Sequence, residues 1–442
     1  MGTSAVTGKT RKVTHAVWVE FDMNDHFDLD QPSLTAKYVN QLGFSLYREL
    51  APQSNLVFSP LGVYCALRML YEGARGGTRQ AISQLLYQDS EPVSSDGFQV
   101  LLEELHSHAE LKDYQLRLLE IDIRDQEKRI KNGKWSELRD NSVSAYKKLL
   151  RLSISNGIWI QNGYPFKTDF LNGIQSIMAA EAVNLDFEGH PEQACERVNT
   201  WVAEHTRGRI AEMLSPAEIS ELTRGILGNA QYFKATWVHQ FSDLRPGTFH
   251  LFNGTQIEVP MMGSGIFDLN TVQRDDYWAV ELPYQKSRYC GSTFSMILVA
   301  PAFPGIEAFG AIEGQLLQRD VIFQEAEQRD VILNMPPFTI LGCHSLVPLM
   351  AGLGMGEVFD AGADFTGISD ELGFHVDSIL QNSYIKVDQY GTEAAAGTLG
   401  TVLGGWPKWI YLTIDRPFPF MLVERESGLI LFQGKVVNPV AV

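Results

Sequence analysis

The sequence predicts a single α+β domain, in which helices dominate the early part of the chain and strands the late part. Apolar residues recur at helical spacing over residues 33–50, where Ser33 is the expected N-cap, and again over residues 61–71, after Ser59 and Pro60. Runs rich in β-branched and aromatic residues predict buried strands at residues 294–300, 410–414 and 429–432. Beyond residue 150 these pieces mix without a repeat or a βαβ alternation, which favours the α+β class.

Composition and charge exclude several classes of function. The chain has 442 residues, of which 45% are hydrophobic, and this is enough for a large core in one domain. No stretch approaches the ~20 uninterrupted apolar residues that span a bilayer, so we expect no membrane partner. The net charge of −17 opposes general nucleic-acid binding, because phosphate contacts need a basic surface.

The residues that usually carry enzyme chemistry are scattered along the chain. Cys65, Cys195, Cys290 and Cys343 form no CxxC pair, which is typical of ordinary thiols rather than of a metal site or a disulfide framework. The ten histidines form no zinc motif such as HExxH. Ser264 lacks the sequence context of a nucleophile elbow. We therefore expect a protein with no metal, no cofactor and no catalytic activity of its own.

The N-terminal segment, residues 1–32, lacks helical or strand periodicity and ends in an acidic run. We expect a solvated tail there rather than a tether for a partner. The absence of an apolar signal core and the unpaired cysteines favour the cytoplasm. The glycosylation sequon at Asn253 favours secretion with the signal already removed, and secretion is our expectation, with the cytoplasm as the alternative.

One segment has an unusual composition. Residues 391–406 carry small side chains and almost no charge, and strand-forming residues stand on either side. A flexible linker would explain the glycines, but Thr, Ala, Val and Leu are not linker residues. Such side chains suit a segment that is exposed in one state and slides between two packed strands in another.

Around this segment the chain resembles a known family. Residues 391–398 are similar to the hinge of the reactive-centre loop of serpins, a family of protease inhibitors. Seven further segments resemble serpin motifs in the family's order: residues 55–61, 199–210, 229–237, 335–338, 363–369, 415–418 and 432–439. Each match is weak alone, but their order over nearly the whole chain is specific.

The resemblance implies one serpin domain over residues 33–442, with three β-sheets, about nine helices and an exposed reactive-centre loop at about 389–410. It implies a metastable monomer that a protease cleaves in this loop, forming a covalent acyl-enzyme. The freed hinge then inserts into the central sheet and traps the protease. The shutter and breach regions, which govern opening of this sheet in the family, are expected to include Ser59, Asn199 and Trp237.

The hinge composition favours an inhibitor over a non-inhibitory serpin that acts as a carrier, chaperone or storage protein. Alternate hinge side chains must enter the core between packed strands, and small ones are needed there. The hinge consists of Gly391, Thr392, Glu393, Ala394, Ala395, Ala396 and Gly397. Gln389 and Tyr390 stand where the family usually has two glutamates, and Gln381 stands where a shutter histidine is usual. These departures predict altered contacts at the top of the sheet and beneath it.

The scissile bond is placed by counting residues. The candidates for the residue before the cut are Gly405, Trp406, Gly404 and Leu403. Counting from the hinge gives Gly405, counting back from Asp415 gives Trp406, and a shorter loop would give Leu403. Pro407 disfavours a cut after Trp406. Because no arginine lies in this window, we expect elastase-like or chymotrypsin-like serine proteases rather than trypsin-like ones. A cysteine protease is the alternative target.

An insertion at about residues 108–148 departs from the family pattern in the region of helices C and D. It is roughly thirty residues longer than the family's connection there, judged from motif spacing. Its basic residues Arg124, Lys128, Arg129, Lys131 and Lys134 could bind a sulfated glycosaminoglycan. Acidic residues are interleaved with them, so a solvated helical extension is favoured over a polysaccharide site.

Overall fold

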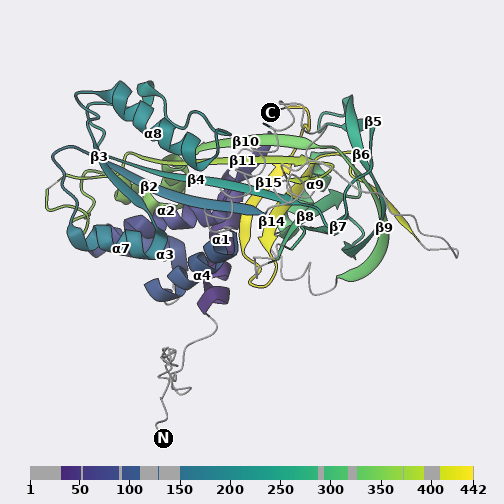
Figure 1. The fold of residues 1–442 in the computed structure, drawn as a ribbon, viewed down its shortest axis with the longest axis horizontal. Coiled ribbons are helices and arrows are strands. Elements are labelled where there is room, and N and C mark those ends of the chain that lie inside the picture. Colours follow the sequence, from purple (N-terminus) through teal and green to yellow (C-terminus); the bar gives the residue numbers. More distant parts are fainter. Residues whose placement is uncertain are drawn as a thin grey trace, which may run out of the picture. The chain divides into compact units, whose positions relative to one another are not determined.

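A six-stranded sheet, called here the central sheet, lies between α8 and the early helices (Figure 1). The structure is a computed structural model that describes residues 31–50, 53–88, 92–109, 128, 150–286, 293–316, 326–371, 373–392 and 409–441. The strand order is β10-β11-β12-β4-β2-β3. In chain order the strands are β2 (Arg151–Gln161), β3 (Glu181–Leu185), β4 (Gly225–Thr236), β10 (Phe338–Ser345), β11 (Ser378–Asp388) and β12 (Gly391–Thr392).

A second sheet joins nine strands in the order β1-β15-β14-β8-β7-β6-β9-β13, with β5 paired to β6. The strands are β1 (Leu56–Phe58), β5 (Asp243–His250), β6 (Gln256–Gln273), β7 (Tyr277–Pro283), β8 (Phe294–Pro301), β9 (Glu327–Met335), β13 (Ile410–Thr413), β14 (Phe418–Glu424) and β15 (Ile430–Val436). The pairing of β6 with β9 shifts register between Gly263 and Ile266. This irregularity divides the second sheet into two parts that share long strands. The resemblance implied three sheets, whereas the described strands are hydrogen-bonded into two.

The helices form separate layers on the two faces of the central sheet. One large core packs α1 (Gln31–Glu49), α2 (Pro60–Gly73), α3 (Gly76–Tyr87), α4 (Ser95–Ala109) and α7 (Thr168–Met178) against its inner face. A smaller core packs α8 (Pro191–His205) on the outer face, where Trp201 meets Trp159 of β2 edge to face. With α9 (Ile306–Leu316) and α11 (Val347–Met350), the described residues hold eight α-helices. The predicted α+β class is confirmed.

The start of α2 shows how the sequence fixes local structure next to the central sheet. Ser59 is the N-cap, since its hydroxyl oxygen accepts the N–H of Gly62 at 3.1 Å, and Pro60 follows at the first helical position. Nearly every residue of this helix is buried because it runs beneath the sheet. The second predicted helix is thus confirmed, with slightly wider bounds. The first predicted helix begins at Gln31, two residues before Ser33.

The three predicted strand runs are found as β8, β13 and β15, and β8 is buried along its whole length. No described helix is long and apolar enough to cross a membrane. Most of the expected insertion at 108–148 lies outside the described residues, as does the expected tail up to residue 30. Of the basic residues proposed for polysaccharide binding, only Lys128 is described, and it is helical and exposed. The polysaccharide site therefore stays a prediction.

Candidate functional site

The central sheet is paired differently at the two ends of the seam between β4 and β11. At one end the two strands pair directly and in parallel, from Ser378 opposite Ile226 to Ser383 opposite Gln231. At the other end the two-residue strand β12 lies between them and pairs antiparallel with both. Residues 384–386 and 232–234 separate the paired end from β12. The sheet is therefore closed along half of the seam and wedged open at its far end.

The wedge consists of Gly391 and Thr392, the first two residues of the predicted hinge. Gly391 has a φ of 154° and lies opposite Thr236. A Cβ atom on Gly391 would come within 2.2 Å of the carbonyl oxygen of Ala235, so that only glycine fits there. Thr392, opposite Ala235 on one side and Val387 on the other, is 1% exposed. The chain thus enters the core of the sheet just before the residues that lie outside the described part.

Two aromatic side chains hold this wedge in place. The hydroxyls of Thr392 and Tyr284 are 2.7 Å apart, and burial raises the pKa of Tyr284 well above its usual value, so its phenol stays neutral. The ring of Tyr284 stacks on Trp237 at 4.3 Å between centroids. Trp237 donates its indole N–H to the carbonyl of Asp388 and its backbone N–H to that of Tyr390, both at 3.0 Å. The turn between β11 and β12 is therefore fastened to the end of β4.

A cluster of buried amides lies beneath the paired end of the seam. Gln381, on β11, donates from its side-chain nitrogen to the carbonyl of Ser59 at 2.5 Å. Asn229, on β4, donates to the side-chain oxygen of Asn156 at 2.9 Å. Gln231 next to it is fully buried. Gln381, which the sequence predicted to alter the contacts beneath the sheet, thus reaches the N-terminus of α2 through its side-chain amide.

On the outer face, one segment after α8 spans the seam. Asn199 accepts the backbone N–H groups of residues 213 and 214 at 2.8 and 2.9 Å and donates to the carbonyl of residue 214. The guanidinium of Arg207 lies 6.0 Å from the ring of Tyr232 on β4, and that of Arg209 lies 5.9 Å from Tyr384 on β11. The segment therefore contacts both strands that border the seam.

The three predicted shutter and breach residues occupy three separate places. Ser59 lies beneath the seam, Trp237 lies at the wedge, and Asn199 lies on α8 at the outer face. Within the hinge only Gly391 and Thr392 are described. The remaining predicted site residues, Glu393 to Gly397 and Leu403 to Trp406, lie outside the described part of the chain. Tyr284 was missed by the sequence analysis, because nothing near it in the sequence links it to a threonine 108 residues away.

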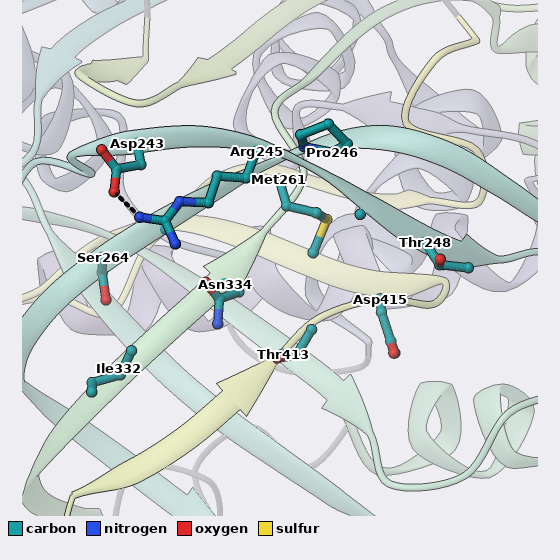
Figure 2. A pocket seen from close by; sticks show the side chains of 12 residues that line it. Asp243, Arg245, Pro246, Thr248, Met261, Ser264, Ile332, Asn334, Thr413 and Asp415 are labelled. Atoms are coloured by element: carbon teal, nitrogen blue, oxygen red, sulfur yellow. Dashed lines mark hydrogen bonds and ion pairs between the residues drawn. The ribbon is translucent and has the colours of Figure 1, made fainter.

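A surface groove of about 490 Å³ lies on β5, β6, β9 and β13 of the second sheet (Figure 2). Asp243 and Arg245 form an ion pair of 2.8 Å on its rim. Its lining also includes Met261, Ile332, Asn334, Thr413 and Asp415. Ser264, the serine considered in the sequence analysis, accepts the N–H of Leu333 at 2.7 Å and donates to a neighbouring carbonyl, so its hydroxyl is engaged by the backbone.

Three of the four cysteines lie among the described residues. Cys65, Cys195 and Cys343 are free thiols, and burial raises the pKa of Cys65 to about 12, so it stays protonated. No group of three metal-binding side chains occurs among the residues that the structure describes. Cys290 lies outside them.

Comparison with known proteins gives the class that this fold and seam define. The family model described as "Serpin (serine protease inhibitor)" matches residues 37–439. An uncharacterised serpin-like protein of Thermococcus kodakarensis is 32% identical, over 91% of this chain and 85% of its own length. The leukocyte elastase inhibitor of Xenopus tropicalis is 27% identical, over 90% of this chain and 97% of its own.

A solved structure shows the same fold. An Arabidopsis serpin in its native stressed conformation is similar with a TM-score of 0.74 and 22% identity, covering 93% of this chain and 98% of its own. The chain belongs to the serpin family, of which many members are protease inhibitors.

Proposed function

We propose that this serpin is a suicide inhibitor of proteases, which is cleaved in its reactive-centre loop and traps the protease by inserting the loop into the central sheet. The observation that carries the proposal is the wedge at the seam. Residues 391–392 already form a short strand between β4 and β11 at one end of the seam, whereas residues 378–383 and 226–231 close the other end by direct pairing. The sheet is thus poised to accept one more strand, which would start from residues 391–392, already paired with β4 and β11.

The register of the seam supports this proposal. The difference in residue number between facing positions of β4 and β11 is the same at both ends of the seam. At one end Ile226 faces Ser378 directly, and at the other end Ala235 and Val387 face each other across Thr392. The register in which a strand continuing from Thr392 would pair with β4 and β11 is therefore already fixed. Its last residue within the sheet would be Thr401, opposite Ser378 and Ile226.

In that register, alternate loop residues would face the core. These are Thr392, Ala394, Ala396, Thr398 and Gly400. Ala394 would lie between Phe233 and Ile385, which are both buried in the main core. Each of these loop side chains is small, so the strand could enter without displacing its neighbours. On the outer face Glu393 would lie between Lys234 and Lys386, where its charge is complemented.

The same register agrees with the predicted cut. The protease nucleophile would attack the carbonyl carbon of the residue before the cut, and the amine of the next residue would leave with a proton as the acyl-enzyme forms. With Leu403 or Gly405 as the acyl residue, the ester would emerge two to four residues beyond Thr401. Ten inserted residues span about 33 Å, so the protease would be carried the length of the sheet.

The small and apolar loop residues support elastase-like or chymotrypsin-like targets. A basic primary residue would be needed for a trypsin-like pocket, and residues 391–406 contain none. We further propose that the protein acts as a secreted monomer that performs no catalysis itself.

The test is incubation with elastase, chymotrypsin and trypsin in turn, followed by denaturing gels and the mass of the released C-terminal peptide. We expect a detergent-stable complex with elastase or chymotrypsin and a peptide that begins after Leu403 or Gly405. Cleavage without a complex, and without a rise in the melting temperature of the cleaved chain, would refute the trapping mechanism and favour a non-inhibitory serpin. A complex formed only with a cysteine protease would change the target class.

A further inference from the structure

We infer that Asn162 is a site of spontaneous deamidation, at which the folded chain slowly forms aspartate and isoaspartate. The chain has five Asn-Gly pairs, and this reaction favours such pairs because glycine has no Cβ atom to hinder it. Four of the pairs lie among the described residues, at Asn156, Asn162, Asn172 and Asn253, and the fifth, at Asn132, lies outside them. The folded structure distinguishes these four sites from one another.

The reaction uses the backbone nitrogen of the residue that follows the asparagine. This nitrogen loses its proton to hydroxide and attacks Cγ of the side chain. The bond from Cγ to the amide nitrogen then breaks, and ammonia leaves with a proton taken from water. Water opens the resulting cyclic imide at either carbonyl, which gives aspartate or isoaspartate. A glycine N–H that already donates a hydrogen bond must first release it, so the reaction is slower there.

Asn162 and Gly163 are the two central residues of a β-turn at the end of β2. The turn is closed by the N–H of Tyr164, which donates to the carbonyl of Gln161 at 3.2 Å. Gly163 has a φ of 96°, as a type II turn requires at its third residue. The closing hydrogen bond comes from the fourth residue of a turn, so the third keeps a free N–H. Within the described part of the chain, the N–H of Gly163 has no hydrogen-bond partner, and both central residues are exposed.

The pair at Asn253 is also exposed, but its glycine occupies a different place in its turn. Gly254 is the fourth residue there, and its N–H donates to the carbonyl of Leu251 at 3.0 Å. The side-chain oxygen of Asn253 accepts the N–H of Thr255, also at 3.0 Å. Both reacting groups are therefore held by hydrogen bonds that the turn at Asn162 lacks.

The remaining two sites lie inside regular secondary structure. Gly173 lies in α7, where backbone N–H groups donate to carbonyls four residues earlier. Gly157 lies within β2, opposite Gly228 of β4 on one side and Glu181 of β3 on the other. Asn156 before it is 2% exposed. Deamidation at either site would require local opening of the helix or of the sheet.

Isoaspartate at residue 162 would alter this end of the central sheet. It adds the Cβ atom to the main chain between Asn162 and Gly163, inside the turn that Tyr164 and Gln161 close. Asn184 of β3 fastens the same turn, because its side-chain nitrogen donates to the carbonyl of Tyr164 at 3.2 Å. The modified turn loses these contacts with β3, so we expect the modified chain to melt at a lower temperature.

The test follows the four described sites by peptide mapping and mass spectrometry while the full chain is kept folded at mildly alkaline pH. Deamidation appears as the mass gain of an amide converted to a carboxylate, and isoaspartate as a peptide that isoaspartyl methyltransferase methylates. The same chain unfolded in urea is the control, because there only the neighbouring residues distinguish the sites. Asn162→Gln is the matched variant, since its longer side chain forms a cyclic imide much more slowly.

We expect Asn162 to deamidate first in the folded chain, roughly 5-fold faster than Asn253, because the hydrogen bond of Gly254 has to break before that site reacts. In urea the rates at the four sites should become similar. The aged unmodified chain should melt at a lower temperature than the fresh one, whereas aged Asn162→Gln should keep its initial melting temperature.

Equal rates at Asn162 and Asn253 in the folded chain would overturn the inference, as would earlier modification at any of the other three sites. A preference for Asn162 that persisted in urea would also overturn it, because the neighbouring residues and not the turn would then be the cause. If aged Asn162→Gln lost as much stability as the aged unmodified chain, the expected effect on β3 would be refuted. None of these measurements depends on whether the serpin traps a protease.

Discussion

Thr392→Arg is the substitution that tests the wedge most directly. Thr392 is 1% exposed and lies between β4 and β11, where it shares a hydrogen bond with Tyr284. An arginine at this position would place a charge among apolar side chains. Burying an unpaired charge costs several kcal/mol, whereas the lost hydrogen bond accounts for about 1 kcal/mol. We therefore expect the variant hinge to leave the sheet.

The consequence for inhibition follows from competition between insertion and deacylation. Insertion must begin at residue 392, so a penalty of about 3 kcal/mol in its transition state slows it roughly a hundredfold. Attack on the loop precedes insertion and should keep its rate. We expect Thr392→Arg to be cleaved at the normal rate by the same protease and to release most of it as active enzyme.

The assay is the stoichiometry of inhibition, obtained from the residual protease activity against the molar ratio of serpin to protease. Thr392→Val is the matched control, because it keeps the shape of the side chain and replaces only the hydroxyl with a methyl group. We expect the control to remain an inhibitor, with a slightly lower melting temperature of the intact chain. If Thr392→Arg inhibited with the stoichiometry of the unmodified chain, residue 392 would not enter the sheet during trapping, and the reasoning would be refuted.

Three further predictions test the surroundings of the seam. Asn199→Ala removes three hydrogen bonds to the segment after α8. It should therefore lower the free energy of unfolding, measured in urea melts, by about 1–3 kcal/mol. An unchanged free energy of unfolding would show that Asn199 has no structural role. Trp237→Phe loses the indole hydrogen bond and part of the stacking, so the intact chain should melt earlier and lose inhibitory activity faster on storage; equal storage lifetimes would contradict this. Burial lowers the pKa of His344, so the unfolded chain binds its proton first, and stability should fall as the pH drops below about 6.5; His344→Gln should reduce this pH dependence, and an unchanged slope would contradict the assignment.

The sequence predicted the fold where local pattern decides it. The cap of α2 follows from Ser59 and Pro60 alone, and β8 follows from an apolar run too short for a helix. The paired strands of the seam were beyond such reasoning, because β4 and β11 lie about 150 residues apart and pair in parallel. The resemblance to a family led us to expect that the hinge enters the central sheet, but it did not say between which strands.

The candidate site shows the same limit more sharply. The small side chains of the hinge were visible in the sequence, because they depart from what loops usually contain. The contact of Thr392 with Tyr284 was not, since it joins two residues whose own neighbours give no signal. Gln381 could be marked as a departure from the family. Its actual role, donating to the carbonyl of Ser59, required the packing of α2 beneath the sheet.

The magnitudes indicate which contacts keep the seam closed. A strand that enters the seam separates β4 from β11 by one further strand spacing of about 4.8 Å, so the segment that touches Tyr232 and Tyr384 from above must release at least one of them. Each arginine–aromatic contact there contributes about 0.5–1 kcal/mol. The direct pairing from residues 226 and 378 to residues 231 and 383 contributes more, because its ladder of backbone hydrogen bonds must break together, each contributing about 1 kcal/mol. The paired end of the seam, with the amides beneath it, therefore sets the main barrier to insertion, and the segment after α8 adds a smaller one that yields as the strands part.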